Sequence, residues 1–200
     1  MKKVTKEYNV YKFEELEKDI QEKVLEKHVE FAYQDYLDYY FYDDMYDLAR
    51  NLLHKHFKGA NYNKIYYELS YSQVSGSMIE FNIDLKDLNE KYKMLDIEEL
   101  NKCIKIGFTK ITIKHDNSNY CHEYTFDIDW NDYTDYDDFE EIQDKIDNMI
   151  EKFKEDIVDM NKELTESGYK QLEDKEYFEE LARINMVDLE FLENGDEFYE

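Results

Sequence analysis

The stretch that decides the fold is IYYELSYSQVSGSMIEFNIDL, residues 65–85. Apolar or aromatic side chains stand at every second position in its two halves, residues 65–71 and 79–85, and the turn-rich segment SQVSGS at 72–77 separates them. A period of two is typical of a strand with one buried face. Two such runs joined by a turn predict an antiparallel β-hairpin.

A second hairpin is expected downstream, with strands at 103–115 and 120–130 and a turn at Asp116-Asn117-Ser118-Asn119. Gly107 interrupts the first of these strands, which suggests a β-bulge. Short strands are also expected at residues 4–13 and 187–191. The sequence therefore predicts an antiparallel sheet of about four to five strands that contains two hairpins.

Helices are predicted where apolar residues recur at three- and four-residue spacing. Phe13, Leu16, Ile20, Val24, His28 and Phe31 form one such stripe, and Leu37, Phe41, Leu48, Leu52 and Phe57 form the next. A long third stripe runs from Phe139 to Leu164. The expected helices are 14–31, 34–57, 96–102, one from 134–138 to Gly168, and 174–184. We therefore expect a single acidic α+β domain, residues 1–200, in which several helices pack with the sheet.

The charge is strongly negative and unevenly distributed. The net charge is −25, and residues 115–200 alone hold 29 acidic against seven basic residues, a net of −22. Proteins that bind DNA directly need Lys and Arg to displace counterions, so direct nucleic-acid binding is not expected. A net charge of about 2–8 is ample for the solubility of a small domain. The excess therefore favours an interaction surface for a basic partner.

The sequence also indicates where the protein works. Two cysteines, Cys103 and Cys121, fit a reducing compartment and form no disulfide framework. The basic N-terminal segment lacks the apolar stretch of a signal peptide. No run of about 18 apolar residues is present, so no membrane-spanning helix is expected. We expect a protein of the host cell cytoplasm.

Motifs for catalysis are missing from the sequence. It has no phosphate-binding glycine loop, no nucleophile elbow and no C-x-x-C or H-E-x-x-H metal motif. His54 and His56 are two residues apart, which splays them around a helix axis rather than pairing them. Cys121 and His122 are adjacent on an expected strand and would face opposite ways. We therefore expect no enzymatic activity and no cofactor.

One segment resembles a metal site in part. The residues from Asp127 to Asp138 mimic the acidic spacing of a calcium loop, but the sixth position is Asp132 where such a loop has glycine. A metal-dependent hydrolase built from this cluster stays open as a less favoured alternative.

The same segment is the candidate partner-binding surface, because carboxylates alternate with aromatic side chains along it. Carboxylates along a strand end and a helix face approximate a line of phosphate charge, and aromatic residues supply the apolar anchors that interfaces favour. The residues expected to contact the partner are Asp129, Asp132, Tyr133, Asp135, Tyr136, Asp137, Asp138, Glu141 and Asp144. An earlier run, residues 35–47, has the same composition, although Leu37, Phe41 and Leu48 within or beside it are expected in the core.

Three short segments carry a resemblance to a protein family. VYKFEEL at 10–16 resembles the V-Y-x-F-x-E-L opening of a group of small acidic proteins from bacteriophages and mobile elements. SQVSG at 72–76 resembles the S-Q-G-D-G turn of that group with two residues replaced, and FLENG at 191–195 resembles its F-x-x-D/N-G ending. The resemblance implies a phage context and no particular activity.

These observations lead to one expected function and one alternative. By analogy with small acidic phage proteins that inhibit host defence, we expect an anti-CRISPR protein. It would bind a basic DNA-binding host protein, such as a Cas9-type effector, and block DNA binding through an acidic, DNA-mimicking surface. The alternative is a phage regulatory or antitoxin-like module that binds a protein without mimicking DNA.

Overall fold

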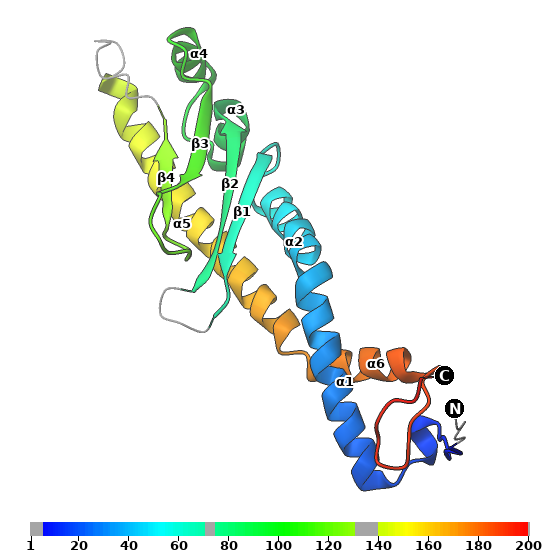
Figure 1. Ribbon diagram of the computed structural model, residues 1–200. Helices are drawn as coiled ribbons and strands as arrows, with labels where there is room; N and C mark the ends of the chain where they lie inside the picture. Colours follow the sequence, from blue (N-terminus) through cyan, green and yellow to red (C-terminus); the bar gives the residue numbers. More distant parts are fainter. Residues whose placement is uncertain (1–5, 71–74, 131–139, 200) are drawn as a thin grey trace, which may run out of the picture. The chain divides into compact units, whose positions relative to one another are not determined.

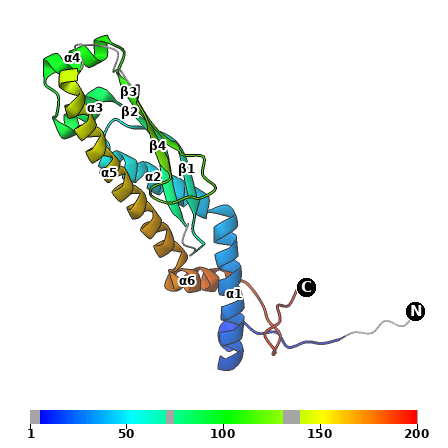
Figure 2. The same ribbon diagram turned by 90° about the vertical axis from the view of Figure 1, so that its left-hand side faces the viewer.

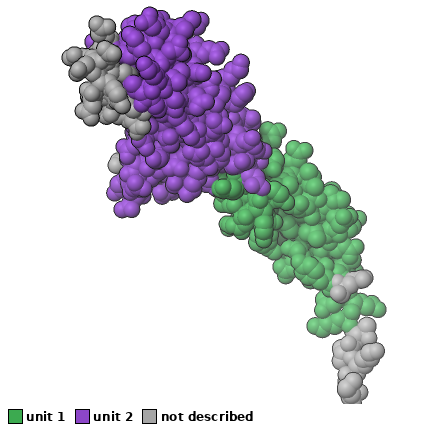
Figure 3. Space-filling model, turned by 90° about the horizontal axis from the view of Figure 1, so that it is seen from above, with its two compact units in different colours: residues 1–42, 173–200 green, residues 43–172 purple. Residues whose placement is uncertain are grey.

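The computed structural model describes residues 6–70, 75–130 and 140–199 (Figure 1). The chain forms two compact units (Figure 3). Unit 1 contains residues 1–42 and 173–200, and unit 2 contains residues 43–172. The single-domain expectation stays a prediction.

Unit 2 is built on the predicted hairpin. Strands β1 (Asn61–Glu68) and β2 (Gly76–Asp84) pair antiparallel, with Ile65 opposite Ile79. Strands β3 (Lys110–His115) and β4 (Phe126–Asp129) extend the sheet in the order β1-β2-β3-β4, and all pairs are antiparallel. The predicted α+β class is confirmed.

The second hairpin is shorter than predicted, because its first part is helical. Helix α4 (Ile97–Lys105) includes Cys103, and its N-terminus is fixed by Asp96, whose carboxylate accepts hydrogen bonds from the backbone N–H groups of Glu98 and Glu99. Gly107 has a φ of 95°. The predicted β-bulge is therefore wrong, since Gly107 caps a helix in the left-handed conformation.

The hydrogen bonds at this cap identify a Schellman motif. The Gly107 N–H bonds to the Ile104 carbonyl at 3.1 Å, and the Phe108 N–H bonds to the Cys103 carbonyl at 3.0 Å. These are the two bonds that define this helix ending. The strand begins only at Lys110.

The second strand of this hairpin also begins later than predicted. Residues 120–125 form turns, in which the Thr125 hydroxyl donates to the His122 carbonyl at 2.8 Å and the Thr125 N–H bonds to the same oxygen. Tyr120 and Tyr124 are exposed. Local side-chain hydrogen bonding therefore outcompetes the strand that the alternating pattern predicts.

Helix α3 (Leu85–Tyr92) was not predicted. Leu85 is the last apolar residue of the alternating run, but it begins this helix and is fully buried with Leu88. The strand pattern and the helix pattern share this residue, so the sequence alone does not separate them.

Helix α5 (Glu140–Leu172) lies along one face of the sheet (Figure 2). Its predicted apolar stripe is confirmed from Ile142 to Leu164. The rings of Phe57, Phe81 and Phe153 meet at the centre of this core, with centroids 5.0–6.0 Å apart. Phe57 directly follows helix α2 (Phe41–His56), Phe81 lies on β2 and Phe153 lies on α5.

The predicted end of this helix at Gly168 is wrong, because α5 continues to Leu172. A Cβ atom on Gly168 would lie 2.7 Å from Leu69 Cδ1 and 3.0 Å from Met45 Sδ. The glycine therefore serves close packing rather than helix termination. The predicted start of the helix, with Phe139, lies outside the described residues.

A buried asparagine ties α5 to the sheet. The Asn161 side chain is fully buried; its Oδ1 accepts a hydrogen bond from the Ile79 N–H at 3.2 Å, and its Nδ2 donates to the Glu123 carbonyl at 3.3 Å. Ser77 adds a hydroxyl bond to the Asn161 carbonyl at 3.2 Å. Buried polar groups need such partners, so these bonds fix how α5 sits on β2.

Unit 1 consists mainly of helices α1 (Lys18–Tyr39) and α6 (Lys175–Met186) with a short 3₁₀ turn, η1 (Phe13–Glu15). The predicted helix over 174–184 is confirmed with small shifts of its ends. The core cluster of unit 1 contains Phe13, Leu16, Val24, Met186 and Phe191.

The two short strands predicted at 4–13 and 187–191 do not form as strands in the described residues. Residues 6–10 are irregular, and Tyr11 pairs with Phe191 in an isolated bridge. The terminal segment folds back through a second bridge between Phe191 and Glu197. Phe13 and Phe191 belong to the buried core cluster of unit 1, whereas Tyr8, Val10 and Val187 are exposed, so neither segment has the alternating buried face of a strand.

The predicted stripe on the first helix is wrong at its end. Phe31 is 51% exposed, whereas Ala32 and Tyr36 are buried. The buried residues Val24, His28, Ala32 and Tyr36 recur every four residues, so the buried side turns gradually around a helix that has 3.6 residues per turn. The helix is then interrupted at Tyr40, which separates α1 from α2. The predicted single helix over residues 34–57 is therefore wrong.

Candidate partner-binding surface

Most residues of the predicted surface fall in a segment that the structure does not describe. Asp132, Tyr133, Asp135, Tyr136, Asp137 and Asp138 lie outside the described residues. Glu141 lies in the first turn of α5, and its side chain is likewise not described. The two described members are Asp129 and Asp144.

Asp129 and Asp144 lie on different elements and differ in their surroundings. Asp129 is exposed on β4, where the Lys114 ammonium lies 2.7 Å from its carboxylate. Its charge is therefore partly neutralised. Asp144 is exposed on α5 and, among the described residues, its carboxylate has no basic partner.

Asp144 begins a line of carboxylates on the solvent side of α5, which we call the α5 acidic stripe. All its members are exposed: Asp144, Asp147, Glu151, Glu155, Asp159 and Glu166. They recur at spacings of three, four or seven residues, which places them on one helix face opposite the buried stripe. At about 1.5 Å per residue, the stripe is about 33 Å long.

The stripe resembles one strand of nucleic acid more closely than a duplex. Over about 33 Å, a duplex carries roughly 20 phosphates and a single strand roughly ten. The stripe offers six carboxylates over that length. Lys162 interrupts it between Asp159 and Glu166, but the Lys162 ammonium lies over the Tyr124 ring at 5.6 Å.

The carboxylates of the stripe form no ion pair with other described residues. Among the described residues, Asp144, Glu151, Glu155, Asp159 and Glu166 make no side-chain hydrogen bond or ion pair, while Asp147 accepts one from the Gln143 amide at 2.9 Å. A partner could therefore bind them without breaking internal ion pairs.

Two other acids of α5 contrast with the stripe, because they hold the helix to its neighbours. Glu163 accepts from Lys55 at 2.6 Å and lies 3.0 Å from His56 Nε2, and these bonds lower the pKa of its carboxyl. Asp156 accepts from Lys91 and Tyr92, both at 2.7 Å. Burial raises its pKa, but these two bonds outweigh burial and the net pKa is lowered.

The sequence contained the signal for the full stripe. Asp144 was predicted as a contact residue, whereas Glu151, Glu155, Asp159 and Glu166 were not. Once the apolar stripe of this helix is assigned, the same period gives the acidic stripe on its opposite side. The predicted surface was instead placed mainly before the helix, at residues 129–138, because aromatic residues alternate with carboxylates there.

The histidines and cysteines form no metal-binding cluster in the described parts of the chain. No cluster of three or more His, Cys, Asp or Glu side chains suited to a metal ion occurs there. Burial raises the pKa of Cys103 to about 11 and that of Cys121 to about 12. Both are therefore protonated thiols at neutral pH and are poor nucleophiles.

The earlier acidic-aromatic run is buried only in part where expected, because Phe41 is buried but Leu37 and Leu48 are half-buried. Tyr36 and Phe41 are buried in the core of unit 1, whereas Tyr39, Tyr40 and Tyr42 are exposed by 72%, 61% and 56%. Tyrosine side chains bury large areas in interfaces and are enriched in binding hot spots. These three neighbouring exposed tyrosines are therefore a second candidate contact surface.

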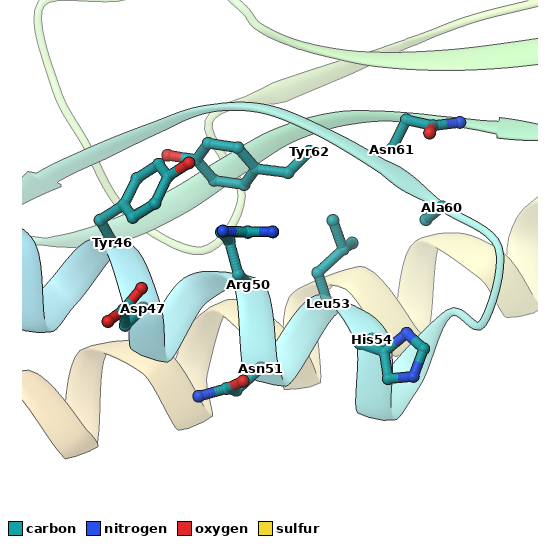
Figure 4. A pocket seen from close by; sticks show the side chains of 9 residues that line it. All are labelled: Tyr46, Asp47, Arg50, Asn51, Leu53, His54, Ala60, Asn61 and Tyr62. Carbon is teal, nitrogen blue, oxygen red and sulfur yellow. The ribbon is translucent and has the colours of Figure 1, made fainter.

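A hollow of about 690 Å³ opens between α2 and β1 (Figure 4). Its lining comes from one side of α2 and from the start of β1, and it includes Tyr46, Asp47, Arg50, His54 and Tyr62. Figure 4 shows the Arg50 side chain rising from α2 toward Tyr62. No motif in the sequence indicated this hollow.

Comparisons with protein-family models, with curated proteins and with solved structures find no match to this chain. No helix in the described parts of the chain has the length and apolar character needed to cross a membrane.

Proposed function

We propose that this protein is an anti-defence inhibitor of phage origin that binds a DNA-binding effector of the host, such as a Cas9-type nuclease. The α5 acidic stripe would occupy the basic channel that otherwise holds DNA or the guide-target duplex. The observation that carries this proposal is the line of exposed carboxylates that, among the described residues, form no ion pair.

The physical support is electrostatic. Effectors of this class hold their heteroduplex in a positively charged channel through its shape and backbone, not its sequence. A line of carboxylates about 33 Å long is negatively charged and extended, as the phosphate backbone of the nucleic acid is. It would therefore attract the same basic side chains of the channel. Complementary charge also speeds encounter and disfavours wrong partners. The net charge of −25 adds a long-range contribution of the same sign.

The tyrosines of the earlier run support the proposal in a second way. Electrostatic contacts alone are screened beyond about 8 Å at physiological ionic strength. Exposed aromatic anchors such as Tyr39, Tyr40 and Tyr42 would slow dissociation through buried apolar area. The carboxylates would therefore raise the association rate, and the tyrosines would lower the dissociation rate.

Salt dependence tests this proposal. The tagged protein would be titrated with purified guide-loaded Cas9-type effector at several salt concentrations. We expect affinity to fall by roughly tenfold or more between 50 and 300 mM salt, because screening weakens exposed charge pairs. An affinity that does not change with salt would contradict binding through the stripe.

The exposed tyrosines also favour a second candidate function. A phage regulatory or antitoxin-like module would bind its partner mainly through Tyr39, Tyr40 and Tyr42, without mimicking DNA. Its affinity would depend little on salt and strongly on these tyrosines. Replacement of all three by serine would then abolish binding, whereas charge changes on α5 would leave it unaffected.

A further inference from the structure

The hollow between α2 and β1 contains an arginine without an acidic partner. The chain has two arginines, Arg50 and Arg183, and 50 acidic residues. The Arg50 guanidinium lies 5.5 Å from the centroid of the Tyr46 ring and, among the described residues, contacts no carboxylate. In a chain with twice as many acidic as basic residues, an arginine left in this state is available for an external anion.

Aromatic rings form one wall of the same hollow. Tyr46 and Tyr62 meet edge to face, with ring centroids 5.0 Å apart and an interplanar angle of 82°. They come from α2 and β1, and the Arg50 side chain lies beside both (Figure 4). The cation–π contact with Tyr46 holds the guanidinium in place, which lowers the entropy lost when an anion binds.

Three further groups define what else a ligand must offer. Asp47 brings a carboxylate into the lining, so a simple anion is repelled there unless it also supplies hydrogen-bond donors. His54 is exposed at the edge of the hollow, and the Asn61 side chain comes from the start of β1. A fitting ligand therefore carries an anionic group, a planar ring and hydroxyl or amine donors.

We propose that this hollow binds a nucleoside monophosphate. Arg50 would hold the phosphate through its planar pair of N–H donors. Tyr46 and Tyr62 would contact the base, because aromatic side chains stack on any base. Asp47 would accept hydrogen bonds from ribose hydroxyls or from an exocyclic amine. The volume of about 690 Å³ lies within the common range of about 300–1,000 Å³ for ligand sites.

The site is independent of the proposed inhibitor function. All of its lining residues belong to α2, to β1 and to the segment between them, and none belongs to the α5 acidic stripe. A change in the stripe is therefore expected to leave nucleotide binding intact. The two proposals can fail separately.

Titrations of the full chain test the site. Isothermal calorimetry and NMR shift mapping would use the four ribonucleoside monophosphates, the matching nucleosides and inorganic phosphate. We expect at least one monophosphate to bind at least tenfold more tightly than its nucleoside or inorganic phosphate, with shifts centred on residues 46–62. Equal binding of inorganic phosphate, or no binding of any monophosphate, overturns the proposal.

Two variants sharpen the test. Arg50→Lys keeps the charge but removes the planar donor pair, and we expect it to weaken binding by about fivefold or more. Arg183→Lys is the matched control, because Arg183 also lies over an aromatic ring, 5.7 Å from the centroid of Phe13, but in unit 1. Unchanged binding by Arg50→Lys, or equal losses in both variants, contradicts the assignment. Arg50 is exposed, so its substitution tests binding rather than folding.

Discussion

Replacing Phe153 with alanine is expected to lower the free energy of unfolding by about 3–5 kcal/mol, because a large buried ring is lost and a cavity remains. Phe153 is fully buried, and its ring lies 5.0 Å from that of Phe57 and 6.0 Å from that of Phe81. Small domains have only about 5–15 kcal/mol of stability in total. Urea denaturation followed by circular dichroism measures the change.

The exposed neighbour Lys154 supplies the control for this variant. Lys154→Ala lies on the same helix and removes no core contact, so we expect a change within about 0.5 kcal/mol. Phe153→Leu should fall between the two, because it fills part of the cavity. A loss of less than about 1 kcal/mol for Phe153→Ala would show that the three rings do not form the centre of the core.

Reversing three charges of the α5 acidic stripe is expected to weaken binding to the effector by well over tenfold. The variant carries Glu151→Lys, Glu155→Lys and Asp159→Lys, whose wild-type carboxylates are exposed and, among the described residues, unpaired. Each reversal replaces an attraction to the basic channel by a repulsion. Surface plasmon resonance separates the association rate, which should fall most, from the dissociation rate.

The chain offers a closely matched control for this triple variant. Glu22, Glu26 and Glu30 are exposed on α1 at the same four-residue spacing, but in unit 1. Their replacement by lysine changes the net charge by the same amount. If both triple variants lose affinity equally, net charge rather than the stripe determines binding.

The parts of the fold that the sequence predicted well are those with strong local periodicity. The first hairpin follows from alternation around Ile65 and Ile79, which pair across the strands. The buried side of α5 follows from a stripe that repeats for six turns. In β2 and α5 one side is buried along most of the element, so the pattern and the tertiary structure agree, whereas in β1 only Ile65 is buried.

The errors lie where local hydrogen bonding or tertiary packing overrides a pattern. Gly107 looked like an interruption in a strand, but it ends a helix through a Schellman motif. Residues 120–125 alternate like a strand, yet Thr125 and His122 hold them in turns. Gly168 looked like a helix end, whereas it admits Leu69 and Met45 against α5. A glycine alone does not say which of these roles it has.

The candidate sites show the same division. The α5 acidic stripe could be derived from the helical period, and Asp144 was identified from the sequence. The hollow at Arg50 could not, because it depends on Tyr62 being brought by β1 to the side of Tyr46 on α2. Residues from two elements become neighbours only through the fold.

The measurement that tests the central claim most directly is a competition for DNA. A guide-loaded Cas9-type effector would be incubated with labelled target DNA and increasing amounts of this protein, and DNA binding followed by fluorescence anisotropy. We predict that the protein prevents the effector from binding DNA and that excess DNA restores this binding. The α5 triple variant should leave DNA binding unchanged. Unaltered DNA binding at saturating protein, or displacement that the triple variant performs equally well, would contradict the account.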